Sequence, residues 1–162
     1  MKSGIWARTL VSIAALCLVA SVAAAAAKDS LIGNWDLDAA KSNVNGTTTF
    51  KSGHVSVTGI KNGYTGAVDL VPTTGNPIHY EFSANYDGSS FPVTGNTYFD
   101  NATVGRVDRN TTIRTERRGG KVVGVTTIEV AKDGKTFTSS SKGTLSDGKQ
   151  FSRTLSWSRA KK

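Results

Sequence analysis

The segment IHYEFSANY at residues 78–86 alternates strictly between apolar and polar side chains. The even-numbered positions are apolar or aromatic, and the odd-numbered positions between them are His, Glu, Ser and Asn. Because successive side chains of a β-strand point to opposite faces, this pattern predicts a strand with one face on a core and the other in water. The segment therefore favours an all-β fold.

The same alternation recurs along the chain between turn dipeptides that contain Asn-Gly, Asp-Gly or Gly-Gly, which favour tight hairpin turns because their residues tolerate positive φ angles. The predicted strands are 33–37, 53–60, 64–72, 77–86, 97–108, 111–118, 121–131, 135–144 and 149–159, with 91–94 as a candidate tenth. The one candidate helix is short, at residues 38–43.

Connections as short as these join antiparallel neighbours, so the strand order is predicted to be a meander. A meander of this length removes its exposed edges by closing. The predicted fold is a single antiparallel up-and-down meander β-barrel of 8–10 strands. The outward positions are rich in Ser, Thr and Lys rather than apolar, which argues against a barrel that spans a membrane.

The N-terminus has the features of a secretory signal peptide at residues 1–27. Lys2 and Arg8 form a basic region, residues 10–20 are apolar, and small residues follow up to a cleavage site after Ala26 or Ala27. The uncharged stretch is about long enough to span a bilayer, so an uncleaved anchor is the alternative. The prediction is a periplasmic or secreted barrel domain at residues 28–162, not membrane-spanning after cleavage.

Charge and cysteine content narrow the classes of partner. The formal net charge is +8, and it becomes +6 once the two basic residues of the leader are removed. The basic residues are spread along the chain, which is typical of a solvated surface, and a patch for anionic lipid or polysaccharide is the alternative. No nucleic-acid partner is predicted. The one cysteine, Cys17, lies in the leader, so the domain has neither a disulfide nor thiol chemistry.

Several segments together resemble a group of bacterial exported, lipocalin-like proteins of the calycin type. The segments are Gly33-Asn34-Trp35-Asp36-Leu37-Asp38, Ala40-Lys41-Ser42, His79-Tyr80, Tyr86-Asp87-Gly88, Pro92-Val93-Thr94-Gly95-Asn96, Arg106-Val107-Asp108-Arg109-Asn110-Thr111, Lys121-Val122-Val123, Asp133-Gly134-Lys135-Thr136 and Asp147-Gly148-Lys149. The resemblance covers nearly the whole domain. It implies a barrel and export, and it carries over no catalytic residues.

The resemblance also implies a structural role for Gly33 and Trp35. In lipocalins the Trp of a Gly-x-Trp motif closes one end of the barrel beneath a basic residue near the end of the last strand. Arg159 or Arg153 is the candidate for that basic residue. The contact is a cation–π interaction worth about 1 kcal/mol.

Catalytic and metal chemistry find little support in the sequence. His54 and His79 have no third ligand at a workable spacing, so no metal site is predicted. Glu81, Glu116 and Glu129 are the acid–base candidates, but charged side chains on strands normally face water. We therefore predict no enzyme, no catalytic residues and no cofactor.

Binding of a small lipophilic ligand is the favoured function. Tyr64, Tyr80 and Phe82 are candidates to line a cavity, together with Val68 and Leu70. The alternative is that they only fill the core.

Two arginines are also candidate ligand residues. Arg153 shares a face with Phe151, Leu155 and Trp157, and Arg106 shares a face with Val104. A buried arginine is costly unless it is paired, and it binds carboxylates well. The alternatives are that Arg153 lies at a barrel mouth or pairs with Glu129 or Trp35.

The predicted ligand is a small hydrophobic or amphiphilic molecule, and the prediction extends to ligands with a negative charge. Two other functions stay open. One is a protein-binding envelope barrel such as a protease inhibitor, for which the loop at residues 71–77 is the candidate contact. The other is a structural or stress-related envelope protein with a filled barrel.

Overall fold

The structure is a computed structural model that describes residues 29–161. The predicted leader, residues 1–27, lies outside this range. Ten strands follow one another: β1 Gly33–Asn45, β2 Phe50–Ile60, β3 Gly63–Pro72, β4 Ile78–Asn85, β5 Asp87–Thr94, β6 Asn101–Arg106, β7 Thr111–Arg118, β8 Lys121–Val130, β9 Thr136–Thr144 and β10 Gln150–Arg159. Within the described range, no helix is long and apolar enough to cross a membrane.

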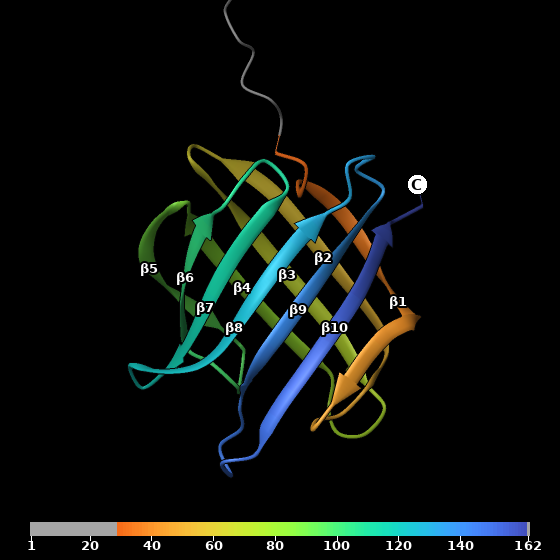
Figure 1. Cartoon of the computed structure of the whole chain (residues 1–162), viewed down its shortest axis with the longest axis vertical. Helices are drawn as coiled ribbons and strands as arrows, with labels where there is room; N and C mark the ends of the chain where they lie inside the picture. Colours follow the sequence, from red (N-terminus) through yellow and green to blue (C-terminus); the bar gives the residue numbers. More distant parts are fainter. Residues whose placement is uncertain (1–28, 162) are drawn as a thin grey trace, which may run out of the picture.

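The strands form one closed barrel in chain order (Figure 1). Each strand pairs antiparallel with its neighbour along the chain, and β1 pairs antiparallel with β10 to close the sheet. The register of that closure places Trp35 opposite Arg159 and Leu37 opposite Trp157. The predicted all-β, up-and-down meander is confirmed, and its ten strands lie at the upper limit of the predicted range.

The helix predicted at residues 38–43 is wrong, because this segment is an irregular part of β1. The pairing with β10 passes from Asp38↔Ser156 to Asn43↔Thr154, so extra residues bulge out of the first strand. The Asp38 side chain accepts a hydrogen bond from the Lys41 amide at 3.2 Å. Such local bonds between side chain and backbone stabilise a turn within the strand, and the helix-like pattern came from this turn.

The strand predicted at residues 97–108 is also shorter than expected. Its first part is a loop in which Asn96 Oδ1 accepts hydrogen bonds from the amides of Tyr98 and Phe99 at 2.7 and 3.2 Å. An Asn side chain that binds the backbone two and three residues later favours a turn over a strand. The candidate tenth strand at residues 91–94 is the end of β5.

The core fills the barrel interior, as the alternation predicts. On β4, Tyr80 and Ala84 are buried, whereas His79 and Glu81 are exposed. The largest buried apolar side chains are Trp35, Phe50, Tyr64, Leu70, Tyr80, Phe91, Phe99, Ile128, Phe137, Phe151, Leu155 and Trp157.

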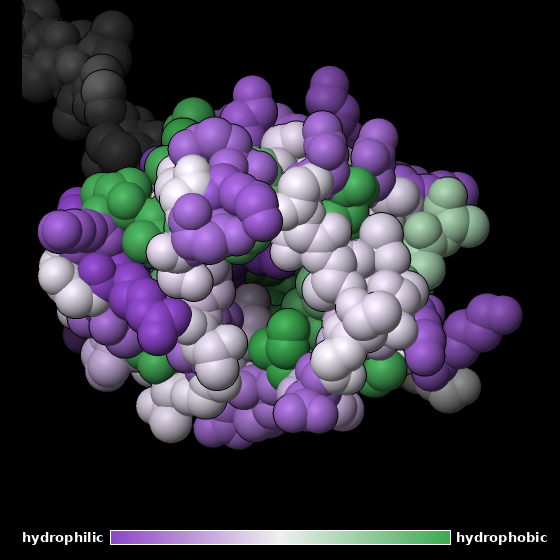
Figure 2. All heavy atoms as spheres, turned by 90° about the horizontal axis from the view of Figure 1, so that it is seen from below, coloured by the Kyte–Doolittle hydropathy of each residue, from purple (hydrophilic) through white to green (hydrophobic). Residues whose placement is uncertain are grey.

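The two ends of the barrel differ. The connections β1–β2, β3–β4, β5–β6, β7–β8 and β9–β10 lie at the lower end of Figure 1, and the described chain termini lie at the upper end. The lower end is hollowed at its centre, inside a ring of mainly hydrophilic and neutral side chains (Figure 2). At the upper end Leu31, which precedes β1, is 5% exposed and lines the interior. We refer to the hollow at the lower end as the lower mouth.

Candidate functional site

The barrel encloses an interior cavity of about 60 Å³. Its wall consists of Leu31, Val55, Val57, Tyr64, Val68, Leu70, Tyr80, Phe82, Arg114, Ile128, Phe137, Ser139, Ser141, Arg153, Leu155 and Trp157. The set includes the predicted ligand residues Tyr64, Tyr80, Phe82 and Arg153, but it does not include Arg106. The cavity has room for a few waters, and it is smaller than the roughly 300 Å³ at which ligand pockets usually begin.

Aromatic side chains from β3 and β4 form one side of the cavity. The Tyr64 and Phe82 rings meet edge to face with centroids 5.6 Å apart, and the Tyr80 and Phe82 rings stack at 6.3 Å. The buried Tyr64 hydroxyl has no hydrogen-bond partner among the described residues. Burial raises the pKa of Tyr64 to about 12, so its hydroxyl stays protonated and able to donate a hydrogen bond.

The opposite side of the cavity carries a row of polar side chains across four strands. The register places Arg114, Thr126, Ser141 and Arg153 directly beside one another on β7, β8, β9 and β10. We call these four residues the polar row. The hydroxyls of Thr126 and Ser141 are hydrogen-bonded to each other at 2.8 Å.

Arg114 is neutralised by a carboxylate that the sequence pattern did not reveal. Its Nε and Nη2 donate to Glu116 Oε1 at 3.0 and 2.6 Å, and Thr126 Oγ1 donates to the same oxygen at 2.9 Å. Burial by itself would lower the pKa of Arg114, but the charge of Glu116 and the nearby Tyr80 and Tyr64 outweigh it and raise that pKa. Arg114 and Glu116 therefore form a buried, net neutral ion pair.

The expectation that Glu116 faces water is wrong, since its side chain is fully buried. The pattern on β7 concealed this arrangement because Ile113, the apolar residue of the strand, is 39% exposed. The one available signal was the phase shared by Thr112, Arg114 and Glu116, which are all buried.

Among residues 29–161, Arg153 has no such neutralising partner. Its Nε is buried without a hydrogen bond, and its guanidinium lies 6.0 Å from the Phe50 ring and 5.5 Å from the Phe151 ring. The alternative partners weighed from the sequence do not contact it: Glu129 lies on the exposed face of β8, and Trp35 contacts Arg159. The polar row together with Glu116 therefore has a net charge of +1.

The upper end gathers the residues that the lipocalin resemblance implied for closure. The Arg159 guanidinium lies 3.8 Å from the centroid of a Trp35 ring, and Trp35 Nε1 donates to Leu31 O at 2.9 Å. Gly33 has a φ of +137°, and the guanidinium occupies the space of a Cβ at this position, so both backbone and space favour glycine.

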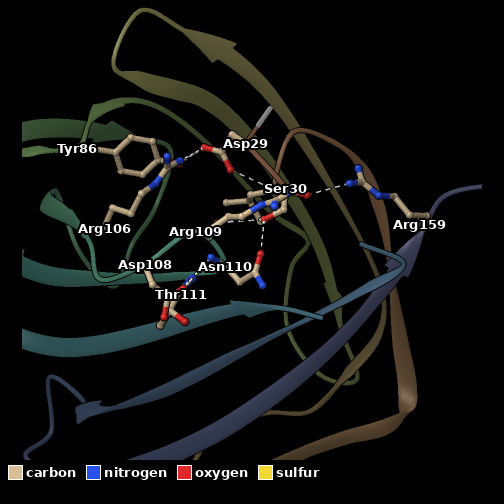
Figure 3. A network of polar contacts seen from close by, with 10 residues as sticks. Asp29, Ser30, Tyr86, Arg106, Asp108, Arg109, Asn110, Thr111 and Arg159 are labelled. Carbon is tan, nitrogen blue, oxygen red and sulfur yellow. Dashed lines mark hydrogen bonds and ion pairs between the residues drawn. The ribbon is translucent and has the colours of Figure 1, made fainter. Parts of the chain in front are cut away.

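Arg106 also lies at this upper end rather than in the cavity (Figure 3). It forms an ion pair with Asp29 and covers the Tyr86 ring at 3.9 Å. Asp29 also accepts a hydrogen bond from the Tyr86 hydroxyl, and Ser30 lies beside Arg109 and Asn110. Arg106 therefore fixes the segment that precedes β1.

The outer wall carries hydrogen-bonded histidines that do not point to catalysis. His54 Nδ1 lies 2.8 Å from Asp36 Oδ1, and His54 Nε2 lies 3.3 Å from Ser56 Oγ. Ser56 is paired with β1 on one side and with β3 on the other. Its neighbouring amides thus serve the sheet rather than an oxyanion. Among residues 29–161 no three His, Cys, Asp or Glu side chains are grouped to hold a metal ion.

Comparison with known proteins identifies no family for this chain, so its classification rests on the fold. No protein-family model matches the chain, and no curated protein matches it significantly. The class that the structure defines is a closed ten-stranded antiparallel β-barrel, which is compatible with a lipocalin-like fold.

Proposed function

We propose that the protein binds a small amphiphilic molecule inside the barrel. The apolar part of the ligand contacts the aromatic side formed by Tyr64, Tyr80 and Phe82. Its polar end, an acid in the simplest case, meets Arg153 on the opposite side. This assignment deepens the lipocalin-like prediction by giving each side of the cavity a separate task.

The observation that carries the proposal is the buried, unpartnered Nε of Arg153. Leaving a charged donor unsatisfied away from water costs several kcal/mol. Within residues 29–161 no carboxylate forms an ion pair with Arg153. A ligand acid would supply two hydrogen bonds and the missing negative charge.

The size of the cavity restricts the ligand. A volume of about 60 Å³ suits a short molecule, and a longer one requires side chains to move aside. Phe82 is only partly buried, and Arg153 is a long side chain at the edge of the polar row. These two side chains are therefore the ones that would make room.

Export is part of the same proposal. The leader at residues 1–27 would direct the chain to the periplasm or the medium, and the processed protein would begin at Ala27 or Lys28. Sequencing the N-terminus of the protein recovered from the producing cell tests this directly. A chain that retains Met1 contradicts processing.

The test of binding is a native mass spectrum of the processed protein, taken before and after denaturation. We expect an added mass that disappears on unfolding, and its absence in an Arg153→Met variant that keeps an unbranched apolar side chain but lacks the guanidinium and its charge. If the native protein carries no added mass and gains none with short fatty acids, the binding proposal fails. The barrel would then be a filled one.

A further inference from the structure

The β7–β8 turn at the lower end of the barrel carries three basic residues within five positions. Arg117, Arg118 and Lys121 flank Gly119 and Gly120, whose φ angles of +55° and +79° belong to a tight hairpin turn. Arg118 and Lys121 are exposed. In the part of the chain that the structure describes, none of the three cations forms an ion pair. The turn therefore presents positive charge to the solvent.

A carboxylate contacts this turn but does not cancel its charge. Asp100 Oδ2 accepts a hydrogen bond from the Gly119 amide at 3.0 Å. The three cations and this carboxylate together leave a net charge of +2. The β9–β10 turn at the same end differs, because Lys149 there is paired with Asp147 at 2.9 Å. Positive charge on the lower turns is thus concentrated between β7 and β8.

An exposed apolar side chain lies next to these cations. Val122 is 54% exposed. The pairing of β7 with β8 passes from Glu116↔Gly124 to Arg117↔Val122, so Val123 is an extra residue that forms a β-bulge. A bulge bends its strand and re-aims the side chains beside it. In Figure 1 the turn projects at the lower left of the barrel.

A surface hollow of about 260 Å³ lies beside the turn. Its lining includes Arg118 and Val123 from the hairpin, Tyr98 from the β5–β6 loop, and Leu145 and Ser146 from the β9–β10 loop. The hollow thus combines a guanidinium with apolar side chains and a hydroxyl. This combination suits the interface of a bilayer, where lipid phosphates lie close to the first methylenes of the acyl chains.

The exposed valine favours a lipid surface over a water-soluble polyanion. An anionic polysaccharide is attracted by charge and offers no apolar phase in which Val122 would be buried. At an anionic bilayer, cations contact the headgroups while an apolar neighbour enters the boundary with the acyl chains.

We propose that the β7–β8 turn docks the lower end of the barrel on the surface of an anionic bilayer. Arg118 and Lys121 contact lipid phosphates, and Val122 enters the acyl boundary. The lower mouth would then lie next to the membrane, where lipophilic molecules accumulate. This inference does not depend on the proposed ligand-binding function, because it concerns the outer surface alone.

The test is co-sedimentation of the processed protein with lipid vesicles, since the processed chain lacks the apolar leader. Vesicles of phosphatidylcholine are compared with vesicles of an equal mixture of phosphatidylcholine and phosphatidylglycerol. We expect binding to the mixed vesicles only, and weaker binding as the salt concentration rises. Equal binding to the two kinds of vesicle, or binding to neither, overturns the proposal and leaves ligand binding in the barrel standing.

A pair of double variants tests the location of the docking surface. Arg118→Gln with Lys121→Gln should lower the affinity for mixed vesicles about 30-fold, at about 1 kcal/mol for each charge near the surface. The matched control is Lys132→Gln with Lys135→Gln, which removes two exposed lysines from the β8–β9 turn at the upper end. The control should change the affinity by no more than about twofold. Equal losses would show attraction by overall net charge and overturn a docking face.

Val122→Ser tests the lipid partner at constant charge. We expect the affinity for mixed vesicles to fall about fivefold, because a half-exposed valine no longer enters the acyl boundary. An unchanged affinity would show that the turn recognises charge alone, as it would on a polysaccharide, and would overturn docking on a bilayer. The comparison of vesicles with the unmodified protein stands even if a variant does not fold.

Discussion

Arg153 and Arg159 lie on the same strand and the same inner face, yet their surroundings are opposite. Arg159 donates from every guanidinium nitrogen. Its Nη1 and Nη2 bond to the carbonyl oxygens of Ile32 and Ser30 at 2.6 and 2.8 Å, and its Nε bonds to that of Gly134 at 2.9 Å. Arg153 buries its Nε with no acceptor in the part of the chain that the structure describes.

The difference shows how hydrogen bonding separates a structural arginine from a binding one. Arg159 links the segment before β1 to the β8–β9 turn and covers Trp35, so its bonds are complete without any ligand. Burial lowers its pKa, but the group stays charged. Arg153 is complete only when a further molecule supplies an acceptor. Substitutions around Arg159 should therefore lower the free energy of unfolding, whereas a substitution of Arg153 should weaken ligand binding.

The largest effect is expected from Trp35→Ala at the closed end. The variant removes a fully buried indole that packs edge to face on Phe137 at 4.8 Å, and with it the ring beneath Arg159. The cavity left behind should lower the free energy of unfolding by about 3–5 kcal/mol. Urea denaturation measures this, with Val107→Ala at a 61% exposed position as the control. Similar losses for the two variants would contradict a closing role.

Arg159→Met should have the next largest effect. It leaves three backbone carbonyls without their donors, and we expect a loss of about 2 kcal/mol. The loss should come with faster amide exchange at Leu31 and Ile32, because the segment before β1 is no longer held. Unchanged exchange at those two amides would show that the Asp29 ion pair with Arg106 is sufficient by itself.

The sequence predicts those features of the two regions that follow from the alternation of inward and outward side chains along a strand. The alternation on β4 and β10 gives the strands, the inner face and the inward position of Arg153. The position of Trp35 beneath a basic residue follows from the resemblance to the Gly-x-Trp motif of lipocalins and not from alternation. That resemblance leaves Arg153 and Arg159 as equal candidates for the basic residue. The register of β1 with β10, which puts Arg159 opposite Trp35, decides between them.

The polar row could not be predicted from the sequence, because it depends on side-chain contacts between neighbouring strands. Taken alone, the strand pattern assigns the face with Arg114 and Glu116 to solvent. The apolar Ile113 on the other face strengthens that assignment, although Ile113 is the exposed residue. The two charges are tolerated inside because they neutralise each other, and because Thr126, ten positions after Glu116 on the next strand, donates a hydrogen bond to Glu116. The place of Arg106 outside the cavity has a related cause: Arg106 is in phase with Val104, but its acceptor Asp29 lies in a segment before the first strand.

Arg153→Met should not show the loss of stability that we expect for Arg159→Met. Removing a partly buried charge whose Nε has no acceptor among the described residues, while keeping an unbranched apolar side chain, should leave the free energy of unfolding within about 0.5 kcal/mol of the unmodified protein, or raise it. Ligand binding should be lost in the same variant. Matched urea melts of the Met variants at 153 and 159 measure the contrast, and equal destabilisation would mean that Arg153 is also structural.

The smallest effect is expected on the outer wall, where water can satisfy what the protein does not. His79 Nδ1 lies 2.7 Å from Asp69 Oδ1, and this hydrogen bond, with a smaller contribution from Glu81, raises the pKa of His79 above its ordinary value of 6.5. A raised folded-state pKa stabilises the fold fully below the unfolded value, and that contribution disappears as the pH rises through the folded value. An NMR titration of the His79 ring should therefore show a midpoint above 6.5, and Asp69→Asn should lower it. A midpoint at or below 6.5 in the unmodified protein would mean that the exposed pair is not formed in solution, whereas the buried contacts of Arg159 would be unaffected.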